Sequence, residues 1–138
     1  MNESTKSVLL VDDEPQDLRL LKQAFTRVAA EIQLFDVTDG QKAIRYLDAG
    51  MQRPNLILLD LDRPALTGFD VLRWVRSSAS LRHLPILVLT GSSNESDIRK
   101  AYEEGANGYL VKSPEFDGML DMARMIKHYW FSALQLPR

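Results

Sequence analysis

The sequence contains no cysteine, which excludes disulfide bonds and thiolate metal sites in this chain of 138 residues. Only two histidines are present, His83 and His128, and their wide separation argues against a metal centre built on histidine ligands. Apolar runs such as Val8–Val11 and Ile86–Leu89 are far too short to cross a bilayer. The polar N-terminus is not followed by an apolar signal segment. We therefore expect a cytoplasmic protein that does not enter the membrane.

Neither sign of charge is in excess, because 17 Lys and Arg stand against 19 Asp and Glu, for a net charge of −2. With 45 % apolar residues, this composition is ordinary for a globular domain and argues against a disordered tail or a nucleic-acid binder. No repeat, low-complexity tract or linker interrupts the chain. We expect a single domain over residues 1–138, with its core at about 7–131.

Short apolar runs alternate with helical patterns along the chain, which predicts parallel strand–helix units joined by right-handed crossovers. Strands this short and apolar are typical of a parallel sheet with both faces buried. Helix starts are marked by two predicted capping boxes, Thr38 with Gln41 and Ser92 with Glu95. The predicted strands are Ser7–Val11, Glu31–Val37, Leu56–Leu59, Ile86–Leu89 and Tyr109–Val111. The predicted helices run from Pro15 to Val28, Thr38 to Gly50, Thr67 to Ser77, Ser92 to Gly105 and about Phe116 to Phe131.

Polar residues follow four of the predicted strands at the point where each strand ends. In an open parallel sheet these ends lie at one edge, where ligands bind. Any one of these residues alone would be interpreted as a solvated loop residue, but the whole set at one edge indicates a functional site. The set consists of Asp12 and Asp13 after the first strand, Asp60 after the third, Thr90 at the fourth and Lys112 after the fifth.

The chemistry of this set suits phosphoryl transfer, which depends mainly on positioning and charge neutralisation. Clustered carboxylates repel one another, so a cation is expected among them, and oxygen ligands with room for water are typical of Mg²⁺. Such a metal would neutralise Asp13 and Asp60 and contact an incoming phosphoryl group. Lys112 would add a positive charge and Thr90 a hydroxyl for the phosphoryl oxygens. No cysteine or histidine is placed to compete with Asp60 as the nucleophile.

With these residues the sequence resembles the receiver domains of two-component response regulators over nearly its whole length. The pattern at Ser92–Ile98 is similar to the single-domain regulators that partner bacterial phytochrome-type kinases. The resemblance implies an α/β, flavodoxin-like doubly wound (βα)5 fold, whose five-stranded parallel sheet has the order 2-1-3-4-5. The segments that carry it are Val11–Pro15, Leu58–Pro64 with Gly68, Val88–Gly91 and Gly105–Lys112.

The resemblance also implies a role for each residue of the acceptor site. Asp60 would be the phospho-acceptor, and Lys112 would contact its phosphoryl group. Thr90 and Tyr109 would form a switch pair, in which the hydroxyl moves toward the phosphoryl oxygens and the aromatic ring rotates inward behind it. A half-buried strand aromatic is the ordinary interpretation of such a tyrosine, but the position of Tyr109 three residues before Lys112 favours the switch.

The same resemblance implies a Mg²⁺ site. Asp13 and Asp60 would bind the metal directly, Asp12 would help through water, and the backbone carbonyl of Asp62 would complete the protein ligands. The chain would be a signalling phospho-acceptor rather than an enzyme with turnover. It would catalyse only its own phosphorylation from a histidine kinase and, more slowly, its own dephosphorylation.

Three positions near the acceptor depart from the family pattern or add to it. Arg63 stands where an apolar residue is usual; we expect its side chain to point to solvent, and the alternative is that its cation reaches the phosphoryl site. Asp62 adds a carboxylate that can influence an attacking water. The usual Lys-Pro peptide is replaced by Lys112-Ser113-Pro114, and a cis bond at Lys112-Ser113 would cost several kcal/mol more than one preceding proline.

Only residues 132–138 follow the last predicted helix, so we expect no output domain and a signal that leaves through the receiver's own surface. The apolar side chains of this helix and tail cover more than one face. We expect a homodimer or a partner-docking surface there, together with Tyr102; the alternative is that these side chains merely wrap the core. They are Met119, Leu120, Met122, Met125, Ile126, Tyr129, Trp130, Phe131, Leu134 and Leu136.

Three other functions compete with this interpretation. Asp60-Leu61-Asp62 is similar to the nucleophile motif of haloacid-dehalogenase-type phosphatases, but it follows the third strand and leaves no room for a cap domain. A pseudo-receiver that has lost phosphorylation normally lacks an acidic, threonine or lysine position, and all are present here. A dinucleotide-binding enzyme is disfavoured because no Gly-x-Gly-x-x-Gly follows the first strand.

Overall fold

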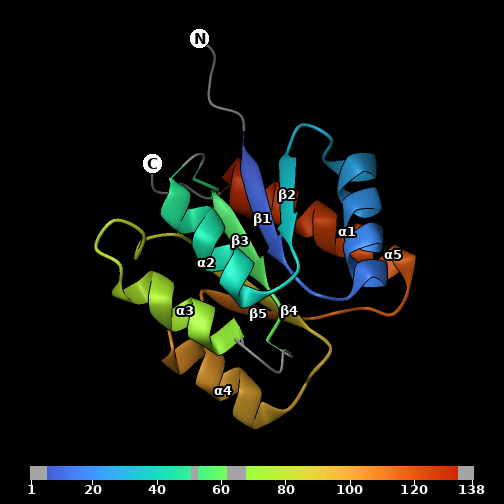
Figure 1. The fold of residues 1–138 in the computed structure, drawn as a ribbon. Coiled ribbons are helices and arrows are strands. Elements are labelled where there is room, and N and C mark those ends of the chain that lie inside the picture. The colour runs from blue at the N-terminus through green and yellow to red at the C-terminus, as the bar shows by residue number, and fades with distance from the viewer. Residues whose placement is uncertain (1–5, 51–52, 62–67, 134–138) are drawn as a thin grey trace.

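Five strands alternate with helices in the computed structural model of the chain, which describes residues 6–50, 53–61 and 68–133 (Figure 1). In chain order the elements are β1 (Ser7–Val11), α1 (Pro15–Val28), β2 (Gln33–Val37), α2 (Gly40–Ala49), β3 (Leu56–Leu59), α3 (Gly68–Ser77), β4 (Ile86–Thr90), α4 (Glu95–Glu103), β5 (Gly108–Val111), α5 (Phe116–Met125) and the π-helix η1 (Ile126–Ala133).

The strands form one parallel sheet in the order β2-β1-β3-β4-β5, as predicted. β1 lies between β2 and β3 in the sheet. Val8 of β1 is therefore opposite Leu34 of β2 on one side and Leu56 of β3 on the other. From β1 the chain goes first to one side and then to the other. The switch in direction leaves the carboxyl ends of β1 and β3 open for a ligand, which is where the polar residues gather.

Helices cover both faces of the sheet, with α1 and α5 on one side and α2, α3 and α4 on the other (Figure 1). Alternate residues of β1 enter the two cores: Leu10 packs in the cluster with Phe25, and Leu9 in the cluster with Val71. β1, β3 and β4 are buried along their whole length, as their apolar runs predict. The edge strands β2 and β5 are only partly buried, because each has a neighbour on one side alone.

The predicted capping box at the start of α2 is wrong by one residue. Asp39 is the N-cap, and its side chain accepts a hydrogen bond from the Lys42 backbone N–H at 2.8 Å. The Thr38 hydroxyl instead accepts a hydrogen bond from the Lys42 ammonium at 3.0 Å. Asp39 directly precedes the first helical residue, which is the position from which a side chain reaches the free N–H groups. The helix ends as predicted at Gly50, which has φ of +69°.

The start of α4 also differs from the prediction. Asn94 is the N-cap, and its side chain accepts a hydrogen bond from the Ser96 backbone N–H at 2.9 Å. Ser92 lies two residues earlier, where its hydroxyl donates to Asp97 at 2.7 Å. Thr67, the predicted cap of α3, lies outside the described residues. The next turn holds Gly105, with φ of +107°, so a glycine does follow α4 as predicted.

Other boundaries also differ from the sequence prediction: β4 continues to Thr90 instead of ending at Leu89, and β5 begins at Gly108 instead of Tyr109. β2 begins at Gln33 rather than Glu31, because the N–H of Ile32 donates to the carbonyl of Ala29 in a turn. The last helix changes from α to π geometry at Ile126 instead of continuing as one α-helix. Within the described part of the chain, no helix combines the length and the apolar character that crossing a membrane requires.

Candidate functional site

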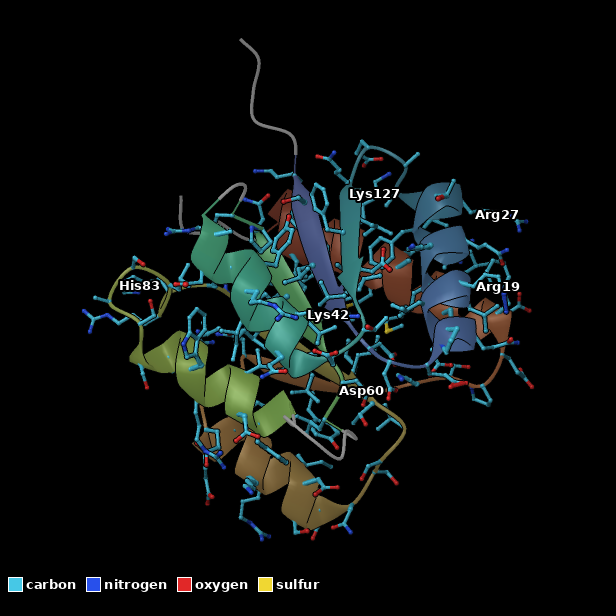
Figure 2. All side chains as sticks on the ribbon, in the orientation of Figure 1. Arg19, Arg27, Lys42, Asp60, His83 and Lys127 are labelled. Atoms are coloured by element: carbon cyan, nitrogen blue, oxygen red, sulfur yellow. The ribbon has the colours of Figure 1, made fainter. Side chains whose placement is uncertain are left out.

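Asp12 and Asp60 lie just beyond the carboxyl ends of β1 and β3. The backbone N–H of Asp12 donates to the carbonyl of Val37 at 3.2 Å, and that of Asp60 donates to the carbonyl of Val11 at 3.0 Å. These bonds extend the sheet ladder and fix both backbones. The two carboxylates are only 4 % and 3 % exposed. Figure 2 shows Asp60 at this end of the sheet.

Lys112, which follows the edge strand β5, brings a cation to these carboxylates. Its backbone N–H donates to the carbonyl of Thr90 at 2.8 Å, which holds the residue in line with β5. Its ammonium lies 2.7 Å from Asp12 Oδ2, 2.7 Å from Asp17 Oδ2 and 2.9 Å from Asp60 Oδ2. An ammonium has three donors, so these carboxylates match its full hydrogen-bonding capacity.

Burial raises the pKa of Asp12 to about 6, although the Lys112 ammonium and the backbone N–H of Glu14, 3.0 Å away, act in the opposite direction. Removing the carboxylate from water therefore outweighs its ion pair. For Lys112, burial would lower the pKa, but the hydrogen bonds to Asp12, Asp17 and Asp60 raise it overall. The lysine remains charged, and the negative charge around it exceeds its own.

Gly68, the first residue of α3, packs directly against the acceptor segment. A Cβ atom at this position would lie 2.5 Å from the backbone oxygen of Asp60 and 2.9 Å from the Cα of Leu61. Real Cβ atoms do not approach a backbone so closely, so only glycine allows this contact. The glycine in the predicted motif thus has a steric role beside Asp60.

The predicted switch residues lie on neighbouring strands. Thr90 is the last residue of β4 and is fully buried. Tyr109 of β5 is half-buried and faces the loop that follows β4, because its hydroxyl donates to the backbone carbonyl of Ser92 at 2.9 Å. The tyrosine is therefore hydrogen-bonded to the loop that directly follows Thr90.

The other predicted positions are placed less completely. Asp13 follows Asp12 and is half-buried. Asp62, predicted to offer its backbone carbonyl to the metal, and Arg63 lie outside the described residues. No cis peptide bond occurs in the described residues, and the Lys112–Ser113 bond is among them.

Asp17 was missed by the sequence analysis. It lies in the first turn of α1, and its carboxylate is one of the three bound to Lys112. A signal for it does exist: the first turn of the helix that follows β1 must start at the same sheet edge as Asp12 and Asp13. An acidic residue in a first helical turn is so common, through its interaction with the helix dipole, that this signal alone is weak.

The donor set suits a divalent cation in its chemistry. Among the described residues, no three acidic or histidine side chains converge as a preformed metal site. The buried oxygens of Asp12 and Asp60 instead converge on the Lys112 ammonium. Hard carboxylate oxygens at a site with excess negative charge are what Mg²⁺ prefers. The residues therefore fit a metal, provided that the ammonium withdraws from at least one of these oxygens.

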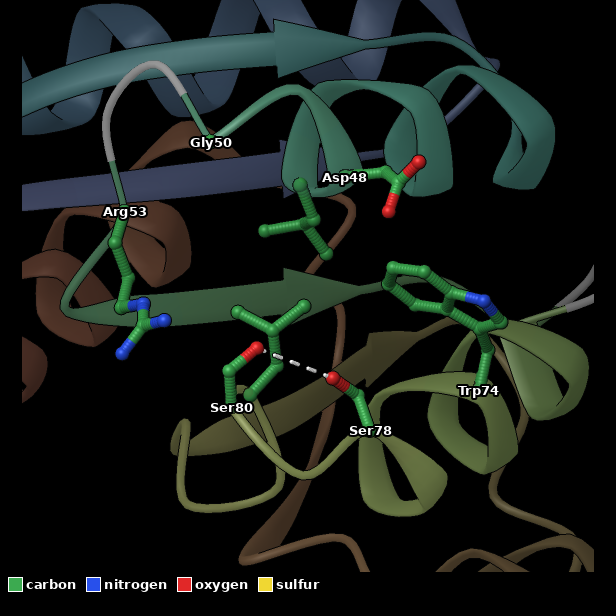
Figure 3. Close-up of a pocket in the computed structure, with 8 residues that line it drawn as sticks. Asp48, Gly50, Arg53, Trp74, Ser78 and Ser80 are labelled. Carbon is green, nitrogen blue, oxygen red and sulfur yellow. Dashed lines mark hydrogen bonds between the residues drawn. The ribbon is translucent and has the colours of Figure 1, made fainter.

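A separate hollow of about 200 Å³ lies between α2 and α3 (Figure 3). Its residues come from the ends of these helices that lead into β3 and β4, so it lies at the amino end of the sheet, away from Asp60. His83, on the loop between α3 and β4, is also away from Asp60 (Figure 2). The hollow is lined by Leu47, Asp48, Gly50, Arg53, Trp74, Ser78, Ser80 and Leu81.

Comparison with known proteins decides the family. Residues 8–124 match the family model of the response regulator receiver domain. The chain belongs to this family. The receiver is 34 % identical over 137 residues to the response regulator Rcp1 of Synechocystis sp., an alignment that covers 96 % of this chain and 93 % of Rcp1.

Solved structures agree with the family assignment of this receiver. The crystal structure of the phosphorylated cyanobacterial phytochrome response regulator RcpA is similar with a TM-score of 0.91 and 34 % identity, covering 98 % of this chain and all of RcpA. The Mn²⁺-bound form of Rcp1 is similar with a TM-score of 0.87 and 34 % identity, covering 96 % of this chain and 99 % of Rcp1. The predicted fold class and the predicted family are confirmed, and the receiver is a signalling protein rather than a conventional enzyme.

Proposed function

We propose that this receiver accepts a phosphoryl group on Asp60 from a histidine kinase in a Mg²⁺-dependent reaction. One observation carries the proposal: the buried Asp60 carboxylate lies 2.9 Å from the Lys112 ammonium, beside Asp12, at the open carboxyl edge of the sheet. A buried carboxylate that is already close to a cation can become an acyl phosphate while the cation offsets the added negative charge.

In the proposed reaction an oxygen of the Asp60 carboxylate attacks the phosphorus of the donor's phosphohistidine. The P–O bond forms as the P–N bond breaks, and the electron pair of that bond returns to the imidazole of the kinase. The Lys112 ammonium is placed to donate to the phosphoryl oxygens, where negative charge develops. We propose the hydroxyl of Thr90, at the end of β4, as a second donor.

Asp13 and Asp60, with Asp12 through water and the backbone carbonyl of Asp62, would hold the metal. Bound Mg²⁺ would neutralise the carboxylates and the phosphoryl oxygens, which lowers the barrier to bringing two anions together. In the slower dephosphorylation step, water would attack the phosphorus as the P–O bond to Asp60 breaks, which would restore the carboxylate and release inorganic phosphate, with Asp62 as the carboxylate that could influence that water. The receiver would thus catalyse only its own phosphorylation and dephosphorylation.

The signal would leave through the surface of the receiver itself. Movement of Thr90 toward the phosphoryl group would free space for the ring of Tyr109, whose hydroxyl would then leave the Ser92 carbonyl. We propose a homodimer through the last helix and tail, where Tyr129 is 50 % exposed; Tyr102 of α4 is also exposed, at 51 %. The likeness to Rcp1 and RcpA favours a phytochrome-type kinase as the partner in the cytoplasm. The net charge of −2 argues against a nucleic-acid partner.

Intact-mass spectrometry after incubation with acetyl phosphate tests the proposal, with wild type and Asp60→Asn compared in Mg²⁺ and in EDTA. We expect one added phosphoryl group on the wild type in Mg²⁺ only, and none on Asp60→Asn. Absence of the added mass while Mg²⁺ binds would favour a pseudo-receiver, and continued release of phosphate without a stable adduct would favour a phosphatase. Sedimentation of the same samples tests the dimer, which a strict monomer at high concentration in both states would contradict.

A further inference from the structure

Among the described residues that contact the Lys112 ammonium, Asp17 is the one that the predicted phosphorylation site does not include. Asp12 and Asp60 are themselves members of the predicted metal site, whereas Asp17 comes from the first turn of α1. Its carboxylate lies 2.7 Å from the ammonium, as close as that of Asp12. The Asp17 side chain is 27 % exposed, so it stands between the buried pair and solvent.

The three contacts of Lys112 conflict with the binding of a metal. A cation that binds Asp60 directly and Asp12 through water competes with the ammonium for the oxygens of both residues, because two like charges repel strongly at contact distance. The lysine must therefore give up at least one of these partners when the metal enters. An ammonium with no other charged partner would resist this, since each lost hydrogen bond would leave a buried donor unsatisfied.

From this geometry we propose that Asp17 is a positioning residue that retains the Lys112 ammonium at the edge of the site when the metal takes the other carboxylates. The inference rests on the proposed function and deepens it. Asp17 offers a charged acceptor outside the predicted metal ligands, so the lysine can give up at least one of its other two partners and still keep a charged one. It also keeps the ammonium beside Asp60, where the phosphoryl oxygens arrive.

Removal of this carboxylate should weaken the binding of Mg²⁺. In Asp17→Asn the Lys112 ammonium keeps only Asp12 and Asp60 as carboxylate partners. The metal must then compete for these oxygens with a lysine that has no other carboxylate to bind. We expect the dissociation constant for Mg²⁺, measured by titration calorimetry without a phosphodonor, to rise about threefold to tenfold. The Mg²⁺ concentration for half-maximal phosphorylation by acetyl phosphate should rise by the same factor.

A matched control and a conservative variant separate positioning from simple charge. Asp117→Asn makes the same change in the exposed first turn of α5 and should leave the Mg²⁺ affinity within about twofold of wild type. Asp17→Glu should restore most of the affinity, because its longer carboxylate can still reach the ammonium. Equal Mg²⁺ affinity in Asp17→Asn, Asp117→Asn and wild type would overturn the proposal.

A double-mutant cycle tests whether Asp17 acts through the lysine. In a Lys112→Met background, adding Asp17→Asn should leave the Mg²⁺ affinity unchanged, since the carboxylate no longer has an ammonium to hold. An undiminished effect of Asp17→Asn in that background would also overturn the proposal, because Asp17 would then act as a bulk charge. Calorimetry needs no phosphorylation, so a wild type that binds Mg²⁺ but is not phosphorylated contradicts the proposed function and still allows Asp17 to be judged.

Discussion

Two cationic side chains, Arg76 and Lys112, lie at opposite ends of the same sheet and are held in different ways. Lys112, at the carboxyl end, contacts three carboxylates. Arg76, in the last turn of α3, donates at the amino end to uncharged oxygens. Its acceptors are the backbone carbonyls of Gly105 at 2.9 Å, Arg82 at 3.0 Å and Leu84 at 2.7 Å, and the side chain of Asn107 at 2.9 Å.

The partners of each cation determine what it can do. Backbone carbonyls cannot move away without unfolding the segment to which they belong, so Arg76 joins α3, the α3–β4 loop and the α4–β5 loop permanently. Asn107 extends this link, because its side-chain oxygen also accepts the N–H of Ile86 at 2.8 Å. Carboxylates, in contrast, can exchange an ammonium for a metal or a phosphoryl group. The contacts at the amino end therefore favour rigidity, whereas those at the carboxyl end suit the exchange of partners that the proposed function requires.

Replacing Arg76 should cause the largest loss of stability. Arg76→Met would remove four hydrogen bonds and leave partly buried carbonyls without donors, so we expect the free energy of unfolding to fall by about 2–4 kcal/mol. Burial lowers the pKa of this guanidinium, because removing the charged group from water is unfavourable. This desolvation offsets part of the stabilisation that the four hydrogen bonds provide. Urea denaturation would measure the loss.

Arg82→Met is the matched control for this loss, since the Arg82 side chain is exposed in the same region and its change should cost little. Phosphorylation of folded Arg76→Met should remain normal, because the change is at the far end of the sheet. Equal stability of the two variants, or a defect in phosphorylation of folded Arg76→Met alone, would break the distinction between a rigid end and an exchanging end.

Replacing Asp12 should have the opposite sign, an increase in stability. Its pKa in the folded protein, about 6, is above the ordinary value of 3.8, so ionising it costs the folded state free energy as the pH rises through this window. Asp12→Asn removes that cost and keeps an oxygen that can accept a hydrogen bond. In metal-free buffer at pH 7.5, we expect the free energy of unfolding to rise by about 1–3 kcal/mol.

The pH dependence identifies the cause of this gain. As the pH falls toward the ordinary value of 3.8, the carboxyl group becomes protonated in the unfolded chain as well as in the folded one, so most of the advantage of Asp12→Asn should be lost by about pH 4. Asp121→Asn, which changes a carboxylate that is 79 % exposed, should show no such pattern. Urea denaturation of the three proteins at pH 4, 6 and 7.5 would show it, and a gain that persists unchanged at pH 4 would rule out relief of buried charge.

The exchanging end was easier to predict from the sequence than the rigid end. Asp12, Asp60 and Lys112 each follow an apolar strand, and strand ends meet at one edge whatever the details of packing. Asp17 was missed because its partner is 95 residues away and its own surroundings read as an ordinary helix start. Arg76 was missed because its acceptors are mostly backbone carbonyls, which every residue possesses and which therefore leave no pattern in the sequence.

The residues that begin helices α2 and α4 were also difficult to predict from the sequence. At α2 and α4, two or more residues that can cap a helix stand close together, and the backbone path alone decides which one is placed to do so. Thr38 and Ser92 were chosen from their spacing to Gln41 and Glu95, whereas Asp39 and Asn94 are the caps. The central strands were predictable because burial on both faces demands uninterrupted apolar residues.

The smallest expected effect concerns the hydroxyl of Tyr109, a neutral contact at the exchanging end. Tyr109→Phe removes its hydrogen bond to the Ser92 carbonyl, 2.9 Å away, from a half-buried position where water can partly replace it. We expect the free energy of unfolding to fall by about 0.5–1.5 kcal/mol in urea denaturation, with the added phosphoryl mass unchanged. Tyr102→Phe, at a side chain that is 51 % exposed, should cost less than Tyr109→Phe. A loss in Tyr109→Phe as large as that in Arg76→Met would contradict the comparison, because the loop after β4 would then be as firmly fixed as the amino end and could not move when Asp60 is phosphorylated.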